Sequence, residues 1–276
     1  MQQVLTHVIA NDEIMAGGYL MWLDCSQIAS AVVPGQFVMV LCRGQDADVP
    51  LLRRPLSIHR VDGGRLALLY AVVGQGTQWL ADRKPGDQVD ILGPLGNNFT
   101  ISVDTKKLLI VAGGIGIAPT VALADYALDR GYITTLLIGC RSAEHMYPEA
   151  QFDRAVSMGL NVVVVTEDGS KGRKGMVTEA LAELAPTADQ IYACGPLPMY
   201  NAINRDLDML AGTPTQVCLE QMMGCGWGVC YGCTIETQNG LRKVCQDGPI
   251  FDIENVVWNS VVDPRSTALA DHPQVT

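Results

Sequence analysis

The chain has 276 residues, a formal net charge of −10, a pI near 4.8 and only 17% charged residues. An acidic chain without a basic stripe is not expected to bind nucleic acid or an anionic membrane surface, because it would not neutralise their phosphates. The length exceeds that of one average domain, so two or three domains with their own cores are expected.

The sequence contains no apparent targeting or membrane-spanning segment. Its first residues lack the basic start and apolar core of a signal peptide. The longest run without charge, from Leu108 to Ala124, contains three glycines and Pro119, so a buried strand and turn is expected there. Five cysteines without paired spacing suit a reducing compartment: Cys25, Cys42, Cys140, Cys194 and Cys218. A cytoplasmic location is therefore expected.

Residues 1–102 are predicted to form a small antiparallel β-barrel. β-type runs at 19–24, 36–41, 65–73 and 88–92 are separated by turns rich in glycine and proline. The only predicted helix in this part is Thr77 to Arg83. Short strands at this spacing, without long helices between them, are typical of a barrel.

Two motifs in this predicted barrel suggest a phosphate site. Arg54-Pro55-Leu56-Ser57 places a guanidinium, a fixed turn and a hydroxyl within four residues. Gly74-Gln75-Gly76-Thr77 ends a strand and begins a short helix, with Thr77 as the candidate N-cap, so its free N–H groups suit a pyrophosphate. Each motif alone is equally consistent with an ordinary turn or cap.

Residues 103–212 alternate between strands and helices. Apolar strands are predicted at 108–112, 133–139, 161–165 and 190–194, and helices at 119–130, 144–158, 176–185 and 198–210. This order predicts a parallel α/β sheet covered on both faces, which binds ligands at the carboxyl ends of its strands.

The predicted strand ends carry glycines and polar residues. The first strand runs into GGIGIAP, which contains Gly113, Gly114 and Gly116, and the last runs into Cys194-Gly195-Pro196. A glycine turn that leads into a helix lets a dinucleotide phosphate meet backbone N–H groups, although the ordinary G-x-G-x-x-G fingerprint is absent. One such turn can serve packing alone, but polar ends on four strands favour a binding site.

Residues 213–276 contain the most specific pattern in the chain. Cys225, Cys230, Cys233 and Cys245 follow the spacing C-x4-C-x2-C-x11-C, which is typical of four thiolates holding a 2Fe-2S cluster. Glycines alternate with these cysteines, as a loop wrapped around a compact inorganic group requires. Zinc is the alternative, but structural zinc sites use two similar cysteine pairs, and free thiols or disulfides are a further alternative. The tail after about Val261 has no assignable role.

The motifs taken together resemble a known family. RPLS, LYAVVGQGT, GPLGNNF, GGIGIAP and CGP occur in an order similar to that of the ferredoxin reductase family, in which an FAD-binding barrel precedes an NAD(P)-binding domain. LEQMMGCGWGVCYGC and KVCQDGPIFD narrow the resemblance to the electron-transfer subunits of class B dihydroorotate dehydrogenases. The resemblance extends to about Val257.

The resemblance implies a role for individual residues. Ser57, near the reactive atom of FAD, and Cys194, near the nicotinamide, are the expected catalytic residues. The other FAD contacts would be Arg54, Pro55, Leu56, Leu69, Tyr70, Ala71, Gly76 and Thr77. The NAD contacts would be Gly113, Gly114, Gly116, Cys194, Gly195 and Pro196. The cluster ligands would be Cys225, Cys230, Cys233 and Cys245.

Two residues depart from the family pattern. Ala71 stands where an arginine often follows the tyrosine, so one phosphate contact is lost or supplied from elsewhere. Trp227 stands in the cysteine loop where a smaller aliphatic residue is usual. Its ring is expected to cover the cluster, to meet a partner or simply to pack locally.

The implied cofactors define an electron-transfer function. Nicotinamide transfers two electrons as a hydride and an iron–sulfur centre accepts one at a time, so a flavin between them is expected to divide the pair. In the family the partner is an FMN-containing catalytic subunit, in a heterotetramer with two of each chain. That partner oxidises dihydroorotate to orotate in pyrimidine biosynthesis, with NAD as the final acceptor.

Other functions remain open from the sequence. The chain is also consistent with a flavin and iron–sulfur subunit of another oxidoreductase, such as a sulfide dehydrogenase or an electron-bifurcating transhydrogenase, or with a metal-stabilised binding module without redox activity. NADP is not excluded, because Arg141 suits a 2′-phosphate whereas Glu167 and Asp168 oppose one. The four histidines form no catalytic spacing, and only His59 lies near a motif.

Overall fold

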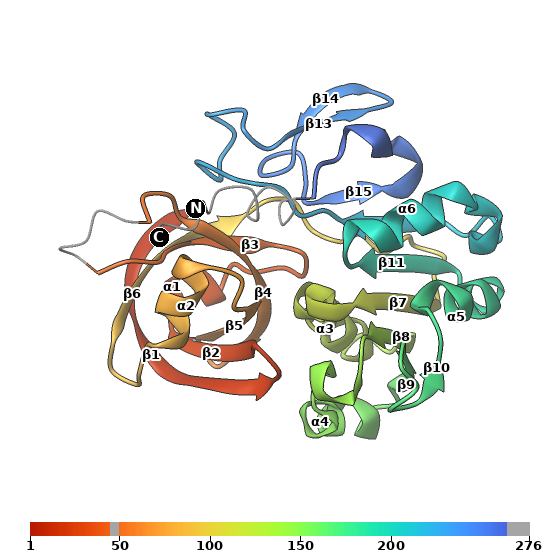
Figure 1. Cartoon of the computed structure of the whole chain (residues 1–276), viewed down its shortest axis with the longest axis horizontal. Helices are drawn as coiled ribbons and strands as arrows, with labels where there is room; N and C mark the ends of the chain where they lie inside the picture. Colours follow the sequence, from red (N-terminus) through yellow and green to blue (C-terminus); the bar gives the residue numbers. More distant parts are fainter. Residues whose placement is uncertain (45–49, 264–276) are drawn as a thin grey trace, which may run out of the picture.

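The computed structural model describes residues 1–44 and 50–263. Figure 1 shows a barrel beside an open sheet, with the C-terminal segment lying against both. This arrangement confirms the predicted fold class, a multi-domain α+β chain with an antiparallel barrel, a parallel α/β sheet and a small C-terminal unit. The tail from residue 264 onward lies outside the described residues.

Six strands close the barrel in the order β1-β2-β5-β4-β3-β6. Side chains along these strands alternate between the interior and the outside, as a closed antiparallel sheet requires; in β6, Val89 and Ile91 point inward. The strands are β1 (Gln2–Met15), β2 (Gly18–Asp24), β3 (Phe37–Leu41), β4 (Arg54–Asp62), β5 (Arg65–Ala71) and β6 (Gln88–Leu95). The short helices α1 (Ser26–Ala29) and α2 (Gln75–Ala81) lie between strands.

Two sequence expectations for the barrel are wrong. RPLS does not form a turn, because residues 54–57 begin the extended strand β4 and pair with β3. Thr77 is not the N-cap of α2; it is the third helical residue, and its hydroxyl accepts hydrogen bonds from the N–H groups of Val73 at 2.9 Å and Gly74 at 3.2 Å. Strand β1 was not expected at all, although it pairs with both β2 and β6.

The second sheet has the order β10-β9-β8-β7-β11-β12-β15 and is parallel except for β15. Its strands are β7 (Lys107–Gly113), β8 (Ile133–Cys140), β9 (Asn161–Thr166), β10 (Arg173–Lys174), β11 (Gln190–Cys194), β12 (Thr215–Cys218) and β15 (Ile250–Asp252). The flanking helices are α3 (Ile117–Leu128), α4 (Asp153–Ser157), α5 (Val177–Leu184) and α6 (Leu197–Arg205). Each central strand is buried, as expected for a sheet covered on both faces.

Two predicted helices are shorter than expected. The segment 144–158 contains only the 3-10 turns at Ala143–His145 and Glu149–Phe152 and the five-residue α4. Pro148 explains the interruption, because proline disfavours helical geometry in the residue before it. The helix expected at 198–210 ends at Arg205 and is followed by a separate 3-10 turn, Leu207–Leu210.

The C-terminal segment adds the hairpin β13 (Thr234–Thr237) and β14 (Gly240–Lys243) and the sheet strand β15. It packs into one apolar core with one face of the sheet and one side of the barrel, because that core contains Met39 and Leu95 together with Cys233 and Cys245. A second core covers the other face of the sheet, and a third fills the barrel. No helix among the described residues has the length and apolar character needed to cross a membrane.

Candidate cofactor sites

The two barrel motifs, residues 54–57 and 74–77, lie next to each other in the structure. A Cβ placed on Gly76, in the first turn of α2, would lie 3.2 Å from Nε of Arg54 on β4. The Arg54 guanidinium also donates a hydrogen bond to the carbonyl of Leu52 at 2.7 Å. β4 and α2 therefore bring a permanent positive charge to the start of the helix, where the predicted pyrophosphate contact with Gly76 and Thr77 would lie.

The remaining predicted flavin residues lie on neighbouring strands. Pro55, Leu56 and Ser57 are half-buried on β4, and Ala71 is half-buried at the end of β5. Leu69 belongs to the core against the sheet, whereas Tyr70 points into the barrel, where its hydroxyl donates to Oδ1 of Asn11 at 3.0 Å. Any contact of Tyr70 with FAD would therefore use its main chain. These flavin contacts stay a prediction.

The glycine turn after β7 closes against the end of β11. A Cβ on Gly116 would lie 2.1 Å from the carbonyl oxygen of Cys194, and a Cβ on Gly113 would lie 2.9 Å from Cδ of Pro196. Gly195 is confined in the same way by Met199 and by Gly113. The predicted NAD motifs GGIGIAP and CGP thus contact each other directly, and only glycine permits this approach.

Gly114 is a glycine for a different reason. Its φ of +54° is in the left-handed region, and a Cβ there would meet no atom within 4 Å. The exposed Gly114 opens the turn toward solvent immediately before α3. The N–H of Ile117, the first residue of α3, already donates to the carbonyl of Gly114, and Pro119 has no N–H, so the predicted phosphate contact would fall on the turn at Gly114.

The Cys194 thiol is buried and neutral. Its relative exposure is 2%, and its Sγ lies 3.8 Å from the carbonyl oxygen of Cys218. The neighbouring Cys218 side chain and burial raise the pKa of Cys194 well above its usual value. A thiol in this state is not a nucleophile, so its predicted role beside the nicotinamide would be to shape the pocket.

A small cleft opens beside Gly195, and no sequence pattern predicts which residues line it. Tyr200 forms its inner wall, with a hydroxyl that accepts the N–H of Gly195 at 3.1 Å and donates to the carbonyl of Cys218 at 2.7 Å. Glu220, directly after β12 and Leu219, brings a carboxylate to the cleft. Tyr200 belongs to no short motif, and the LEQMMGC motif that contains Glu220 does not indicate a cleft, so only the sheet topology brings the two residues together. The cleft is lined by Gly195, Leu197, Tyr200, Leu219, Glu220, Val261, Val262 and Asp263.

The ends of β8 and β9 carry the charged groups that are predicted to influence the preference for NAD or NADP. The N–H of Asp168 donates to the carbonyl of Arg141 at 3.2 Å, so the two strand ends lie side by side. Hydrogen bonds from the hydroxyl and N–H of Ser170 lower the pKa of Asp168, which keeps this carboxylate ionised. An ionised carboxylate at this edge opposes a 2′-phosphate.

Three of the predicted cluster ligands lie in the loop before β13 and the fourth, Cys245, follows β14, and backbone N–H groups point to their sulfur atoms. Gly228 donates to Sγ of Cys245 at 3.1 Å, and Val229 donates to Sγ of Cys225 at 3.4 Å. Burial opposes ionisation of Cys225, yet hydrogen bonds from the backbone of Cys230, Trp227 and Val229 lower its pKa to about 6. A loop built this way stabilises negative sulfur, which is the form that binds metal.

The thiols approach one another in two pairs. Cys225 interacts with the side chain of Cys230, and Cys245 with that of Cys233. No group of three or more metal-ligating side chains converges among the described residues. Two irons that each take two thiolates need two such pairs, and this donor set therefore fits a 2Fe-2S cluster.

The cluster loop rests on the barrel. A Cβ on Gly226 would lie 2.4 Å from Cγ of Met39 on β3, and Met39 pairs with Pro55 of the predicted flavin segment. Asn97, after β6, donates to the carbonyls of Asp247 and Ile250 and accepts the N–H of Ile250. One strand of the barrel thus separates the cysteine loop from RPLS.

The two faces of the cluster loop differ in exposure. Cys233 and Cys245 are each 2% exposed and face the core, whereas Cys230 is exposed. Trp227 is 43% exposed, so its ring does not simply pack inside the loop. Large exposed apolar side chains occur in this loop and in the hairpin that follows it: Met222, Trp227, Val229, Tyr231 and Leu241.

Two segments of the chain match known protein families. Residues 220–257 match the iron-sulfur cluster binding domain of dihydroorotate dehydrogenase B, and residues 110–205 match the oxidoreductase NAD-binding domain. Among solved structures, one that describes flavin-based electron bifurcation by an NADH-dependent reduced ferredoxin-NADP oxidoreductase superposes with a TM-score of 0.83 at 27% identity, over 98% of this chain and 95% of the other.

Similar curated proteins agree over nearly their full length. The dihydroorotate dehydrogenase B (NAD(+)) electron transfer subunit of Desulforamulus reducens is 40% identical over 91% of this chain and 97% of that protein. The subunit of the same name from a Geobacillus species is 37% identical over 93% of this chain and 99% of that protein. The chain belongs to the family of dihydroorotate dehydrogenase B electron transfer subunits.

Proposed function

We propose that this chain is the electron-transfer subunit of an NAD-dependent dihydroorotate dehydrogenase and that it binds FAD, NAD and a 2Fe-2S cluster. The single observation that carries the proposal is the four-thiol loop packed through Gly226 onto the strand beside RPLS. When bound, FAD exchanges a hydride with nicotinamide and single electrons with an iron–sulfur centre. The proposed units are 1–102 for FAD, 103–212 for NAD and 213–276 for the cluster.

The residues of the chain hold and orient these groups. Arg54 would neutralise phosphate charge at α2, and the half-buried Ser57 would present its hydroxyl to the flavin ring. Gly113, Gly116 and Gly195 bring the ends of β7 and β11 together and leave Gly114 open for the NAD phosphates. The ionised Asp168 supports NAD in preference to NADP. The thiols of Cys225, Cys230, Cys233 and Cys245 would ligate the cluster.

The partner would dock on the exposed side of the cysteine loop. Val229, Tyr231 and Leu241 are 67%, 66% and 70% exposed, and Cys230 is exposed among them. An apolar patch of this kind beside a redox centre suits a protein surface that receives electrons over a short distance. We propose that an FMN-containing catalytic subunit, which oxidises dihydroorotate to orotate, covers this patch in a cytoplasmic heterotetramer.

One measurement tests the cofactor assignment. An anaerobic absorption spectrum of the freshly purified chain, with iron, sulfide and flavin quantified, should give two irons and one FAD per chain. A colourless chain that contains zinc and no flavin would instead establish a metal-stabilised binding module.

Co-purification tests the partner. An FMN protein that brings dihydroorotate oxidation with it supports the first function. A ferredoxin-reducing partner would support a second candidate, a subunit of an electron-bifurcating transhydrogenase or a related enzyme. The superposition with a TM-score of 0.83 onto a structure of that type favours this second candidate. The identity of 40% to a dihydroorotate dehydrogenase subunit favours the first.

A further inference from the structure

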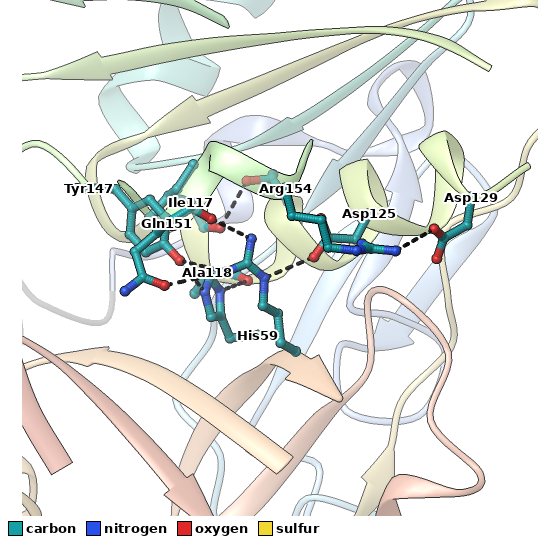
Figure 2. A network of polar contacts seen from close by, with 10 residues as sticks. His59, Ile117, Ala118, Asp125, Asp129, Tyr147, Gln151 and Arg154 are labelled. Atoms are coloured by element: carbon teal, nitrogen blue, oxygen red, sulfur yellow. Dashed lines mark hydrogen bonds and ion pairs between the residues drawn. The ribbon is translucent and has the colours of Figure 1, made fainter. Parts of the chain in front are cut away.

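A histidine is buried where the barrel meets the sheet. His59 lies on β4, two residues after Ser57, and its exposure is 0%. Figure 2 shows its ring beside Ala118, near the start of α3, and beside Tyr147, in the loop after β8. Nδ1 lies 2.8 Å from the carbonyl oxygen of Ala118, and Nε2 lies 2.8 Å from the hydroxyl of Tyr147. One imidazole thus bonds across the boundary at both ring nitrogens.

The partners define the protonation of this ring. The Ala118 carbonyl can only accept, so Nδ1 carries the hydrogen. Burial, together with the charge of Arg60, lowers the pKa of His59 to about 3, and the ring is therefore neutral at physiological pH. In a neutral imidazole with a protonated Nδ1, Nε2 is an acceptor, and Tyr147 must donate to it. Every polar atom of the ring is satisfied in a single orientation.

The neighbouring Arg60 extends the same connection. Its Nε donates to Oδ2 of Asp125 on α3 at 2.8 Å, and its Nη2 donates to the carbonyl of Gln151 at 2.9 Å. Its Nη1 lies 3.4 Å from the Tyr147 hydroxyl, which is free to accept because its hydrogen points to His59. The bonds run in one direction, from Arg60 to Tyr147, from Tyr147 to His59 and from His59 to Ala118.

The two segments joined by His59 are those that carry the proposed cofactor contacts. Ala118 is part of GGIGIAP, two residues after Gly116, and β4 contains Arg54 and Ser57. We propose that His59 is a positioning residue, which holds the glycine turn at 113–116 in register with the flavin segment of β4. The inference rests on the proposed function only for its effect on electron transfer from NADH.

A rigid connection matters here because hydride transfer requires reacting atoms about 3–3.5 Å apart, and a misplacement of about 1 Å can cost about 100-fold in rate. A general loss of stability would give a different result, because the affinities for FAD and NADH would fall together. A positioning residue should instead alter the rate at saturating NADH more than it alters NADH affinity.

The experiment compares three variants of the full chain. His59→Leu removes both bonds at similar volume, and Tyr147→Phe removes only the hydroxyl, so it tests the same connection if the first variant folds poorly. Arg154→Ala is the matched control, because Arg154 pairs with Asp129 at 2.8 Å within the sheet domain and does not reach the barrel (Figure 2).

Two readouts are taken on each variant. Hydrogen–deuterium exchange of the amides at residues 117, 118, 120 and 121 needs no cofactor, and it should accelerate at least about 10-fold in His59→Leu and less in Tyr147→Phe. Stopped-flow reduction of bound flavin at saturating NADH should slow about 10-fold or more in His59→Leu, with FAD content retained and NADH affinity changed less than about threefold. Arg154→Ala should match the unaltered chain in both.

Unchanged exchange and unchanged reduction in His59→Leu and Tyr147→Phe would overturn the proposal, as would equal effects in Arg154→Ala. A chain that binds no FAD would refute the proposed function and leave the exchange experiment intact, so the two failures are distinguishable.

Discussion

Replacing Gly114 by alanine separates the binding role of the glycine turn from its structural role. The φ of Gly114 is +54° and that of Gly131, after the other end of α3, is +78°, and neither Cβ would meet an atom within 4 Å. Because both residues are left-handed and uncrowded, alanine at either should lower the free energy of unfolding by about 1 kcal/mol. Gly131→Ala is therefore a matched control for backbone strain.

Only Gly114 lies in the glycine turn that is proposed to hold the NAD phosphates. Its methyl group would stand where a phosphate approaches the N–H groups, and the loss of one hydrogen bond to a charged group costs about 1.5 kcal/mol or more, which is about 10-fold in affinity. Isothermal titration calorimetry of NADH should show this loss for Gly114→Ala and none for Gly131→Ala, with FAD retained in both. Equal NADH affinities for the two variants would refute the assignment of the turn.

Three further predictions concern the cluster loop and the contact between the barrel and the sheet domain. Cys230→Ser should remove the visible cluster absorption and one-electron transfer but leave NADH-to-dye activity through FAD, and equal loss of both activities would contradict the order of cofactors. Trp227→Ala should weaken affinity for the partner subunit about 10-fold or more in surface plasmon resonance, because exposed aromatic residues often anchor interfaces; unchanged affinity would place the partner elsewhere. Burial lowers the pKa of His59 to about 3, so its imidazole binds a proton more readily in the unfolded chain than in the folded one. The contribution of His59 to the free energy of unfolding is therefore complete above about pH 6.5 and is lost as the pH falls toward 3. Urea unfolding should therefore give about 2 kcal/mol less stability at pH 5 than at pH 7.5, and His59→Leu should lack this component of the slope.

The features that the sequence predicted are those encoded by local rules. Apolar runs followed by glycine turns identified β7 and β11, since buried parallel strands leave a continuous apolar pattern. The cysteine spacing identified the cluster loop, because the thiolates that hold one small cluster come mostly from a short segment at characteristic spacings. Gly116 was recognised for its motif, although its actual constraint is the carbonyl of Cys194, nearly 80 residues away.

The features that were missed depend on long-range packing. RPLS predicts a turn because Pro55 fixes its own φ, yet Pro55 lies in the extended strand β4 and pairs with Met39 of β3. His59 had no informative spacing with other polar residues, because its partners Ala118 and Tyr147 lie 59 and 88 residues away. Likewise, only the pairing of β11 with β12 brings Glu220 and Tyr200 to the same cleft.

The placement of the cysteine loop follows from packing as well as from chain connection. The loop shares one core with the sheet and the barrel, and Gly226, Asn97 and Gly96 fix it against β3 and β6 at several points. A Cβ on Gly96 would lie 2.6 Å from Cδ of Pro249, so the segment after Cys245 is as closely fitted to the barrel as the segment after Cys225. Electron transfer falls steeply with distance, and a cluster held by two contacts to the barrel keeps one distance to the flavin segment while its outer face stays open to a partner.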